Sequence, residues 1–321
     1  MKAVVLFNLG GPDSQEAVEP FLFNIFSDPD VIRLPFGMRW LQKPLARYIS
    51  KKRGPESRGN YARIGGSSPL LANTTLQANK LEAALGDGYR VFIAMRYWKP
   101  SADDVVAKMM EMRADEEIEE IIYLPLYPQK SISTTDSSFN DFDRALAAVG
   151  WNPPTRRITY WYDHPRYPEL VADTIRAELA KADLADTLLL FSAHGIPVSY
   201  VTRDGDVYEQ HIHATVESIT KLLPDELEHM LCYQSRVGPV KWLEPDIEDT
   251  LPRLAEGTKK TILVYPISFV SEHVETLFEL DLLYGEMAQG LGLDYRRLPT
   301  LGDRPAFIRL LADLVQQVKV A

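Results

Sequence analysis

The sequence predicts an α/β protein with two similar halves, each built on a parallel sheet of about four strands flanked by helices. Three observations lead to this fold class. Short apolar runs alternate with segments of helical periodicity along 321 residues, and such alternation is typical of parallel sheets with right-handed crossovers. The chain is longer than a usual single domain. The segment VVLFNLGGP at 4–12 is answered by LLLFSAHGIP at 188–197, which indicates a repeated strand and turn.

The expected elements alternate along the chain. We expect strands at about 3–9, 90–95, 120–126, 156–161, 187–193, 229–233, 261–267 and 294–298. We expect helices at about 68–85, 101–114, 136–149, 166–181, 208–223, 244–255, 272–289 and 304–319. The proline-rich stretch WNPPT at 151–155 divides the chain into halves at 1–152 and 153–321. We expect the final helix to pack back on the first half.

A second pair of segments repeats between the halves. The two segments are IIYLPLYPQKSIST at 121–134 and the similar ILVYPISFVSEHVET at 262–276. In open parallel sheets, ligands bind beyond the carboxyl ends of the strands. Both repeated pairs place polar residues there, so we expect a ligand cleft between the halves.

The composition excludes several classes of protein. Apolar residues make up 45% of the chain and charged residues 25%, as in ordinary globular proteins. A net charge of −10 argues against general nucleic-acid binding, which needs a basic surface. No apolar run approaches the about 20 residues of a membrane span, and AVVLFNLG at the N-terminus is too short for a signal peptide. We therefore expect a cytoplasmic protein.

The motifs that are missing narrow the chemistry further. Cys232 is the single cysteine, which excludes an intramolecular disulfide, a Cys-rich zinc site and a four-thiolate iron–sulfur cluster within one chain. The chain has no G-x-G-x-x-G, G-x-x-x-x-G-K-S/T, G-x-S-x-G or H-E-x-x-H. Dinucleotide binding, P-loop, hydrolase and zinc-protease interpretations lose their main support.

His194 directly follows the apolar run at 187–193, with Gly195 and Pro197 behind it. Glycine and proline bend the chain there, so we expect the imidazole to face the cleft. A functional histidine and a hydrogen-bonded histidine that fixes the turn both fit this position.

An acidic cluster follows the strand at 261–267. If a helix begins near Ser271, then Glu272, Glu275 and Glu279 form one acidic stripe beside His273. These side chains could transfer protons or bind a hard or borderline divalent metal. The alternative is a solvated stripe that is favourable at a helix N-terminus.

The other histidines are not expected to be ligands. His211 and His213 are two residues apart and would point to different faces of a helix, so we expect both to be exposed. We expect His164 and His229 to be structural.

The segment 33–63 is basic within an acidic chain, with nine Arg and Lys residues against Glu56 alone. It also carries Met38 and several aromatic residues. Arg96 and Tyr97 end the second strand, and hydroxyl-bearing side chains cluster around the third, among them Tyr123, Ser131 and Thr134. Together these groups suit a flat, hydrophobic and anionic ligand.

The chain resembles the ferrochelatase family along nearly its whole length. The motifs that carry the resemblance are LFNLGGPDS at 6–14, ARIGGSSP at 62–69, MRYWKP at 95–100, YPQKSISTTDSS at 127–138, LLFSAHGIP at 189–197, YQSRVGP at 233–239 and FVSEHVETLFELD at 269–281. Several such motifs in the family's order make the resemblance specific.

The resemblance implies two flavodoxin-like domains around a porphyrin cleft, and a lyase that inserts Fe(II) into a porphyrin with release of two protons. By matching motif, His194 is a metal ligand or the base for the pyrrole N–H groups, and Glu275 is its carboxylate counterpart across the macrocycle. Glu272 and His273 match the acid–histidine pair thought to relay protons.

The same resemblance implies a set of porphyrin contacts. Arg96 and Tyr97 match residues that line the porphyrin pocket, and we expect further contacts from Met38, Tyr123, Ser131 and Thr134. The segment 33–63 would be a lip over the porphyrin, or a patch for the anionic inner face of the cytoplasmic membrane. A solvated basic loop is the alternative.

Two positions depart from the family's pattern. Leu283 stands where some members carry an acid one turn further toward solvent, so the outer end of a metal route is not predicted here. Animal and some bacterial members carry a [2Fe–2S] cluster on extra cysteines. With Cys232 alone, we expect no cluster and no tightly bound cofactor, and Fe(II) is expected only as a substrate.

The segments YPQ and QSRVGP favour protoporphyrin IX as substrate, and thus protohaem formation as the last step of haem biosynthesis. The alternatives are a coproporphyrin III ferrochelatase, a cobalt-inserting chelatase and a non-catalytic haem carrier. The sequence does not predict whether the protein is a monomer or a homodimer.

Overall fold

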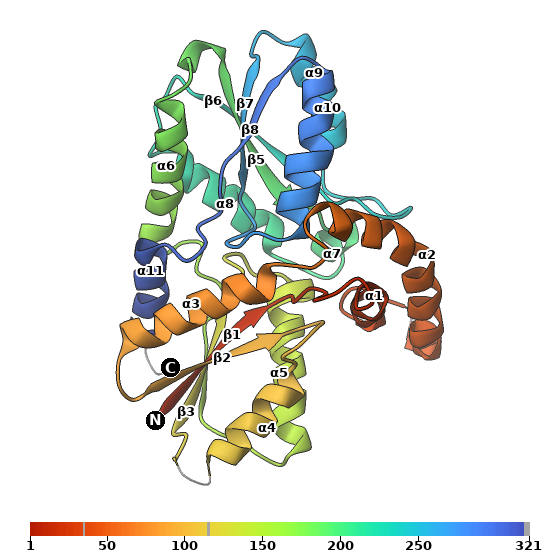
Figure 1. Cartoon of the computed structure of the whole chain (residues 1–321), viewed down its shortest axis with the longest axis vertical. Helices are drawn as coiled ribbons and strands as arrows, with labels where there is room; N and C mark the ends of the chain where they lie inside the picture. Colours follow the sequence, from red (N-terminus) through yellow and green to blue (C-terminus); the bar gives the residue numbers. More distant parts are fainter. Residues whose placement is uncertain (35, 114–115, 318–321) are drawn as a thin grey trace. The chain divides into compact units, whose positions relative to one another are not determined.

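Figure 1 shows the computed structural model, which describes residues 1–34, 36–113 and 116–317. The chain forms two compact units. Unit 1 contains residues 1–127 and 131–159 with the end of the chain from Leu311, and unit 2 contains residues 128–130 and 160–310. The main division follows Thr159, and the final helix changes unit after Leu310.

Unit 1 is built on a four-stranded parallel sheet in the order β2-β1-β3-β4. Its strands are β1 Lys2–Asn8, β2 Tyr89–Met95, β3 Glu120–Pro125 and β4 Thr155–Arg157. All residues of β1 after Lys2 are buried. Both faces of this central strand are therefore covered, which explains why its sequence is a continuous apolar run instead of an alternating one.

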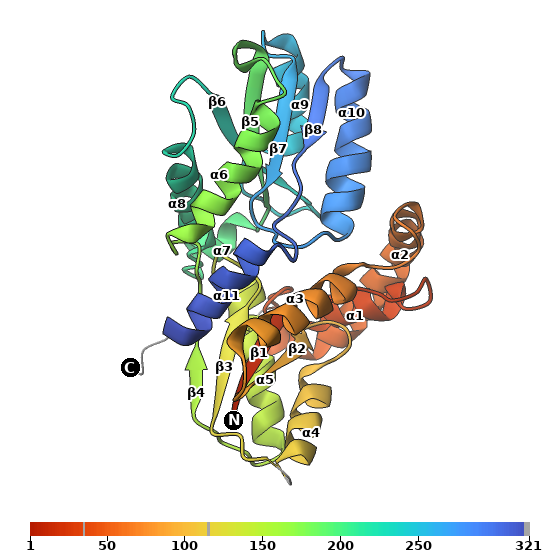
Figure 2. The same cartoon turned by 60° about the vertical axis from the view of Figure 1, so that its left-hand side comes forward.

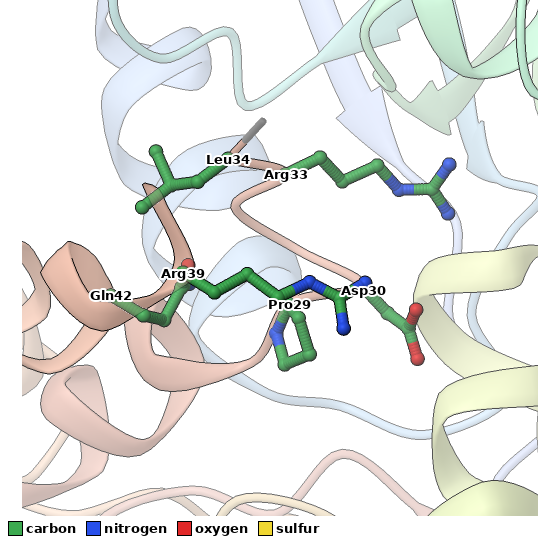
Figure 3. A pocket seen from close by; sticks show the side chains of 6 residues that line it. All are labelled: Pro29, Asp30, Arg33, Leu34, Arg39 and Gln42. Atoms are coloured by element: carbon green, nitrogen blue, oxygen red, sulfur yellow. The ribbon is translucent and has the colours of Figure 1, made fainter. Parts of the chain in front are cut away.

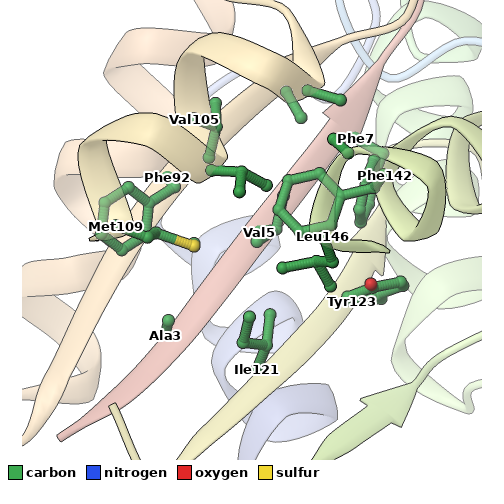
Figure 4. Packing of buried hydrophobic residues seen from close by; sticks show 14 of the residues in the cluster. Ala3, Val5, Phe7, Phe92, Val105, Met109, Ile121, Tyr123, Phe142 and Leu146 are labelled. Carbon is green, nitrogen blue, oxygen red and sulfur yellow. The ribbon is translucent and has the colours of Figure 1, made fainter. Parts of the chain in front are cut away.

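One face of this sheet packs against helices α4 Ala102–Met112 and α5 Ser137–Ala148 (Figure 4). Phe7, Tyr123 and Phe142 meet edge to face, with ring centroids 5.1–5.4 Å apart. Burying an aromatic side chain of this kind contributes about 1.5–3 kcal/mol, and edge-to-face pairs add to that. This packing holds the carboxyl end of β1 in a fixed place.

The remaining helices of unit 1 include a short π-helix. They are α1 Val18–Ser27, η1 Phe36–Leu41, α2 Gln42–Arg63, α3 Leu70–Leu85 and the π-helix η2 Ile132–Asp136. The sequence did not predict α1 or α2. Apart from Tyr61 in its last turns, α2 buries only Gln42, Ala46, Ser50 and Gly54, which are small or polar, so no apolar period marks the helix.

Unit 2 repeats the architecture with the strand order β6-β5-β7-β8, again all parallel (Figures 1 and 2). Its strands are β5 Thr187–His194, β6 Glu228–Gln234, β7 Thr261–Pro266 and β8 Asp294–Arg297. Its helices are α6 Arg166–Leu179, η3 Leu184–Asp186, α7 Val198–Thr202, α8 Tyr208–Thr220, α9 Ile247–Glu256, the π-helix η4 Glu275–Leu283, α10 Tyr284–Gly290 and α11 Pro305–Gln317. Residues 318 and 319 of the predicted final helix lie outside the described residues.

The two sheets confirm the predicted fold class, because each has four parallel strands in an equivalent order with helices around it. The predicted helix at 272–289 is instead a π-helix followed by α10. The other π-helix, η2, follows β3, which holds the place in its sheet that β7 holds in the second. Both π-helices thus follow the repeated segments noted in the sequence, and π-helical turns are frequent at functional sites.

Cys232 lies on β6 in the hydrophobic core of unit 2 and is fully buried. Burial raises the pKa of its thiol well above the usual value. The thiol is therefore an inert part of the core. Among the helices in the described ranges, none combines the length and the apolar character needed to cross a membrane.

Candidate functional site

β5 ends on His194, where a buried strand meets a sharp bend. Residues 187–193 are buried, whereas the side chain of His194 is 38% exposed. The Gly195 N–H donates to the carbonyl of Gln234 at 2.9 Å, and a Cβ on Gly195 would lie 2.9 Å from that same oxygen. Only glycine permits this approach of two strands, so the His-Gly sequence places the imidazole at the end of the strand.

His194 contacts Glu275, the first residue of the π-helix η4. The imidazole Nδ1 lies 2.7 Å from Glu275 Oε2. Desolvation lowers the pKa of His194, but the charge of Glu275 outweighs it and raises that pKa above its usual value. Burial would raise the pKa of Glu275, but the imidazole lowers it to about 2. The imidazole Nδ1–H therefore donates to a carboxylate that stays ionised, and the charge of that carboxylate stabilises a proton on His194.

A second carboxylate, Glu279, lies one π-turn further along η4. Its Oε2 accepts hydrogen bonds from Gln234 Nε2 at 3.1 Å and from Ser235 Oγ at 2.5 Å. Burial and the charge of Glu275 raise the pKa of Glu279 to about 7. Like charges in one buried site disfavour double ionisation, so Glu279 exchanges a proton near neutral pH.

Ser235 has a positive φ of 65°, a conformation that costs a non-glycine residue about 1 kcal/mol or more. Gln234 Nε2 also donates to the main-chain carbonyl of Glu275 at 3.1 Å. The turn at the end of β6 therefore holds both acids of η4. These residues belong to the YQSRVGP motif, but their contacts with η4 were not predicted.

His273 lies beside Glu275 but is buried and electrically neutral. Its Nδ1 lies 3.1 Å from the Ser271 carbonyl, which can only accept, so Nδ1 carries the proton. Desolvation lowers the pKa of His273. Its Nε2 lies 4.0 Å from Glu275 Oε1, and its ring packs on Phe269 with centroids 4.5 Å apart. His194, His273 and Glu275 thus form one cluster.

Glu272 lies outside this cluster, and the predicted acidic stripe does not form. The π-helix begins at Glu275, so Glu272 precedes it. Glu272 Oε1 accepts from Arg297 Nη1 at 2.7 Å and from the N–H and hydroxyl of Thr300, each at 3.0 Å. Although burial raises the pKa of Glu272, Arg297 and Thr300 outweigh it, and that pKa is lowered. Glu272 is therefore a fixed anion.

The main chain of His194 is itself held by two hydroxyl groups. The His194 N–H donates to Ser268 Oγ at 3.1 Å, and Tyr208 Oη donates to the His194 carbonyl at 3.0 Å. Tyr208 Oη and Ser268 Oγ are 2.6 Å apart. Neither residue was singled out in the sequence.

In unit 1, Arg96 and Tyr97 belong to a buried polar cluster around Asp28. Asp28 Oδ2 accepts from Arg96 Nη2 at 2.8 Å, from Tyr97 Oη at 2.8 Å and from Ser137 Oγ at 2.6 Å. Burial raises the pKa of Tyr97 well above its usual value. The side chain of Arg96 is 18% exposed and Tyr97 is 3% exposed, so Arg96 is the one with surface left for a ligand.

The other predicted porphyrin contacts have different environments. Met38 is exposed and Thr134, in η2, is half-buried. Ser131 is buried and caps η2 by accepting from the Ser133 N–H. Tyr123 is fully buried in the core, where its hydroxyl donates to Asp143 Oδ1 at 2.9 Å. Tyr123 is therefore a core residue, because the aromatic rings of Phe7 and Phe142 pack around its ring.

A pocket of about 320 Å³ lies in the segment that follows Asp28 (Figure 3). It is lined by Pro29, Asp30, Arg33, Leu34, Arg39 and Gln42. Two guanidinium groups against one carboxylate give the lining an excess of positive charge. The volume is at the lower end of ligand pockets, which suits a small anion or one arm of a larger ligand.

His211 differs from the prediction of an exposed side chain. It is buried, its Nδ1 accepts from the Lys130 N–H at 3.2 Å, and its ring packs against both Tyr160 and Tyr162. Desolvation lowers its pKa. His213 is exposed as predicted. Within the described part of the chain, no group of three or more His, Cys, Asp or Glu side chains has the arrangement of a metal site.

Known proteins match the chain along its length. A family profile described as Ferrochelatase matches residues 1–319. The ferrochelatase of Thermosynechococcus vestitus is 49% identical over an alignment that covers 99% of this chain and 82% of the relative. The ferrochelatase of Geotalea daltonii is 45% identical and covers 99% and 98%, and that of Aquifex aeolicus is 45% identical and covers 98% of each.

Solved structures share the fold. SirB from Bacillus subtilis with Fe³⁺ has a TM-score of 0.55 at 10% identity, over 99% of this chain and 96% of that one. CbiX, the terminal enzyme for biosynthesis of siroheme in denitrifying bacteria, has a TM-score of 0.53 at 16% identity over 100% of both chains. At these identities the likeness concerns the fold alone.

Proposed function

Because this chain belongs to the ferrochelatase family, whose members are lyases that insert a metal ion into a porphyrin, we propose that it inserts Fe(II) into protoporphyrin IX with release of two protons, as the last step of haem biosynthesis. The observation that carries the proposal is the cluster of His194, Glu275 and Glu279 at the carboxyl edge of the second sheet. Ligands of parallel sheets bind at this edge.

The reaction needs proton acceptors more than it needs a nucleophile. Two pyrrole N–H groups must lose their protons as the metal ion binds the four ring nitrogens. His194 uses Nδ1 to contact Glu275, so Nε2 is the ring nitrogen that can face a porphyrin. A neutral imidazole nitrogen can accept a pyrrole proton or coordinate ferrous iron transiently.

Glu275 and Glu279 have different roles in proton transfer, because their pKa values differ. Glu275, with its pKa lowered to about 2, stays ionised and stabilises the imidazolium that forms when His194 accepts a proton. Glu279, with its pKa raised to about 7, binds or releases a proton at neutral pH without a large free-energy cost. A cation in the site favours the ionised form of both acids, so metal arrival and proton departure are coupled.

The neighbouring residues have supporting roles. His273 is neutral and its unprotonated Nε2 lies 4.0 Å from Glu275 Oε1, so it offers a further proton acceptor beside that carboxylate. Glu272, paired with Arg297, holds the segment that precedes η4 and does not carry protons itself. We therefore assign the proton relay to Glu275 and Glu279, in place of Glu272 in the predicted pair of Glu272 and His273.

The substrate contacts come from unit 1. The positively lined pocket at Arg33 and Arg39 fits a carboxylate arm of the porphyrin. Met38 and the exposed part of Arg96 offer apolar and cationic surface to the macrocycle. A dicarboxylate with a large apolar ring, such as protoporphyrin IX, satisfies both kinds of contact.

The test is metal insertion by the purified protein. Fe(II) under anaerobic conditions, or Zn(II) in air, is added with protoporphyrin IX, and the porphyrin absorption spectrum should convert to that of the metalloporphyrin. His194→Ala and Glu275→Gln should each lower kcat by about 10²- to 10⁴-fold. Matched controls are His213→Ala and Glu256→Gln, both exposed, which should keep the wild-type rate.

Four results would contradict the proposal in different ways. Unchanged rates in both site variants would remove His194 and Glu275 from the mechanism. Faster turnover of coproporphyrin III than of protoporphyrin IX would change the substrate, and a preference for Co(II) would change the metal. Tight haem binding without any insertion would indicate a carrier.

A further inference from the structure

His194 lies where its strand loses one of its two neighbours. The pairing of β5 with β7 ends at Ser192 and Pro266, and the last bond on that side runs from the Ile267 N–H to the Ser192 carbonyl. The pairing with β6 continues to His194 and Gln234. The N–H and C=O of His194 therefore have no ladder partner from β7 and need other groups.

Two hydroxyl groups take the place of the missing rung. The His194 N–H donates to Ser268 Oγ, and Tyr208 Oη donates its single hydrogen to the His194 carbonyl. Since that hydrogen is used, the 2.6 Å contact between the hydroxyls must use the hydrogen of Ser268. The three bonds form a closed ring in which each hydroxyl donates once and accepts once.

The ring is anchored on both sides. Tyr208 is the first residue of α8 and is buried, and its N–H donates to Asp206 Oδ1 at 2.9 Å. Burial raises the pKa of Tyr208 well above its usual value, so the hydroxyl keeps its hydrogen. Ser268 directly follows β7 and Ile267, whose N–H is bonded to β5. The main chain that carries each hydroxyl is therefore fixed, by a helix start for Tyr208 and by a strand end for Ser268.

We propose that Tyr208 and Ser268 are positioning residues, which fix the main chain of His194 and thereby hold its imidazole against Glu275. The proposal rests on the function given to His194 above. The contact between Nδ1 and Glu275 is 2.7 Å, and it depends on the direction of the Cα–Cβ bond of His194. With both peptide groups of His194 held, that direction is set before any substrate binds.

The experiment combines kinetics with amide exchange. Tyr208→Phe keeps the ring and removes two bonds of the closed set, and Ser268→Ala removes the acceptor of the His194 N–H. Each should lower kcat by about tenfold while KM changes less than about twofold, because the catalytic group and not the binding surface is disturbed. Ser268→Thr restores the hydroxyl and should recover most of the rate.

The matched control is Tyr265→Phe. Tyr265 lies on β7 and is fully buried, and its hydroxyl has no hydrogen-bond partner among the described residues. Its loss should therefore leave kcat unchanged. A fall in kcat equal to that of Tyr208→Phe would show a general packing effect and overturn the proposal.

Amide hydrogen exchange of the folded protein tests the proposal without any turnover. Ser268→Ala should speed exchange of the His194 amide by about fivefold to tenfold, while the amide of Leu190 within the same strand keeps its protection. An exchange rate of the His194 amide equal to that of the wild type would overturn the proposal even if kcat fell.

If the wild-type protein lacked chelatase activity, the proposed function would fail, yet the exchange result would still decide whether the hydroxyl ring holds His194. Should Tyr208→Phe not fold, Ser268→Ala and Ser268→Thr carry the test.

Discussion

β1 and β5 hold the same place in their sheets, yet they end on residues of different chemistry. β1 ends on Asn8, which is buried, donates to Thr74 Oγ1 at 3.1 Å and accepts from the Leu9 N–H at 2.9 Å. β5 ends on His194, which is half-buried and pairs with Glu275. One strand end is closed by satisfied amide groups and the other carries a titratable pair. The repeated architecture thus provides two equivalent positions that carry side chains of different chemistry.

The acids of the two units differ in the same way. Asp28 in unit 1 faces a guanidinium, a tyrosine hydroxyl and a serine hydroxyl, and a guanidinium stays protonated in proteins. Glu275 in unit 2 faces an imidazole, a group that exists in a neutral and a protonated form. A carboxylate with a permanent cation is a structural group, whereas a carboxylate with a titratable partner can take part in proton transfer.

The largest effect is expected when the imidazole that faces Glu275 is replaced by a side chain that stays protonated. His194→Arg supplies Glu275 with a fixed cation, as Arg96 does for Asp28. We expect kcat for metal insertion to fall by about 10²- to 10⁴-fold, because a guanidinium cannot accept a proton, while the midpoint of urea unfolding stays close to wild type. Retention of more than a tenth of the wild-type rate would mean that His194 is not the proton acceptor.

The second largest effect is expected in the polar cluster around Asp28 in unit 1. Asp28→Asn removes the charge that Arg96 pairs with, in a site where Asp28 itself is 3% exposed. The free energy of unfolding should fall by about 3 kcal/mol, because one partner of a buried ion pair is left uncompensated. Urea titration measures the loss. Ser14→Ala, on a partly buried hydroxyl with one bond to the Ala17 N–H, serves as a control and should cost about 1 kcal/mol.

Glu279 makes stability depend on pH. With a folded pKa of about 7 and an ordinary value of 4.5, the folded state binds more protons between these values, so the free energy of unfolding falls as the pH rises from 4.5 to 7. Glu275, with a pKa of about 2, acts oppositely and loses its contribution as the pH falls from 4.5 to 2. Glu279→Gln should reduce the fall in the free energy of unfolding between pH 5 and pH 8 by about 2 kcal/mol. A slope identical to wild type in urea titrations at pH 5 and pH 8 would contradict this account.

The smallest expected effect is at Ser235. Ser235→Ala and Ser235→Gly both remove the hydroxyl that holds Glu279, but only glycine tolerates a φ of 65° without cost. The glycine variant should therefore be more stable than the alanine variant by about 1 kcal/mol in thermal or urea unfolding. Equal stability would show that the backbone of this turn is not strained.

Much of the fold was predictable because its strands are buried on both faces. β1, β5 and β7 read as continuous apolar runs, and the repeated segments gave the two halves. The helix α2 was not predictable, since along most of its length it buries Gln42, Ala46, Ser50 and Gly54 instead of an apolar stripe, and Tyr61 is its one large buried side chain. The helix after β7 was predicted as an α-helix, because the sequence period cannot reveal hydrogen bonds that skip one further residue.

Part of the site was predictable in the same sense. His194, Glu275 and His273 lie near each other because each follows a strand of one parallel sheet. The cations that pair with the acids come from distant segments with no local signal. Arg297 meets Glu272 across 25 residues, and Arg96 meets Asp28 across 68. Such pairs follow from tertiary packing, which a single sequence does not encode in any short pattern.

The reactivity of Cys232 can be used to measure how often β6 separates from the second sheet. It is the only thiol in the sequence, it lies two residues before Gln234 on β6, and it is fully buried. Because the thiol is buried, we expect a thiol-reactive dye to modify it only when β6 separates from the sheet. That opening also releases the turn that holds Glu279, so the labelling rate measures how often both open. Comparing that rate with and without a bound porphyrin would reveal whether ligand binding stiffens the strand that supports the acids.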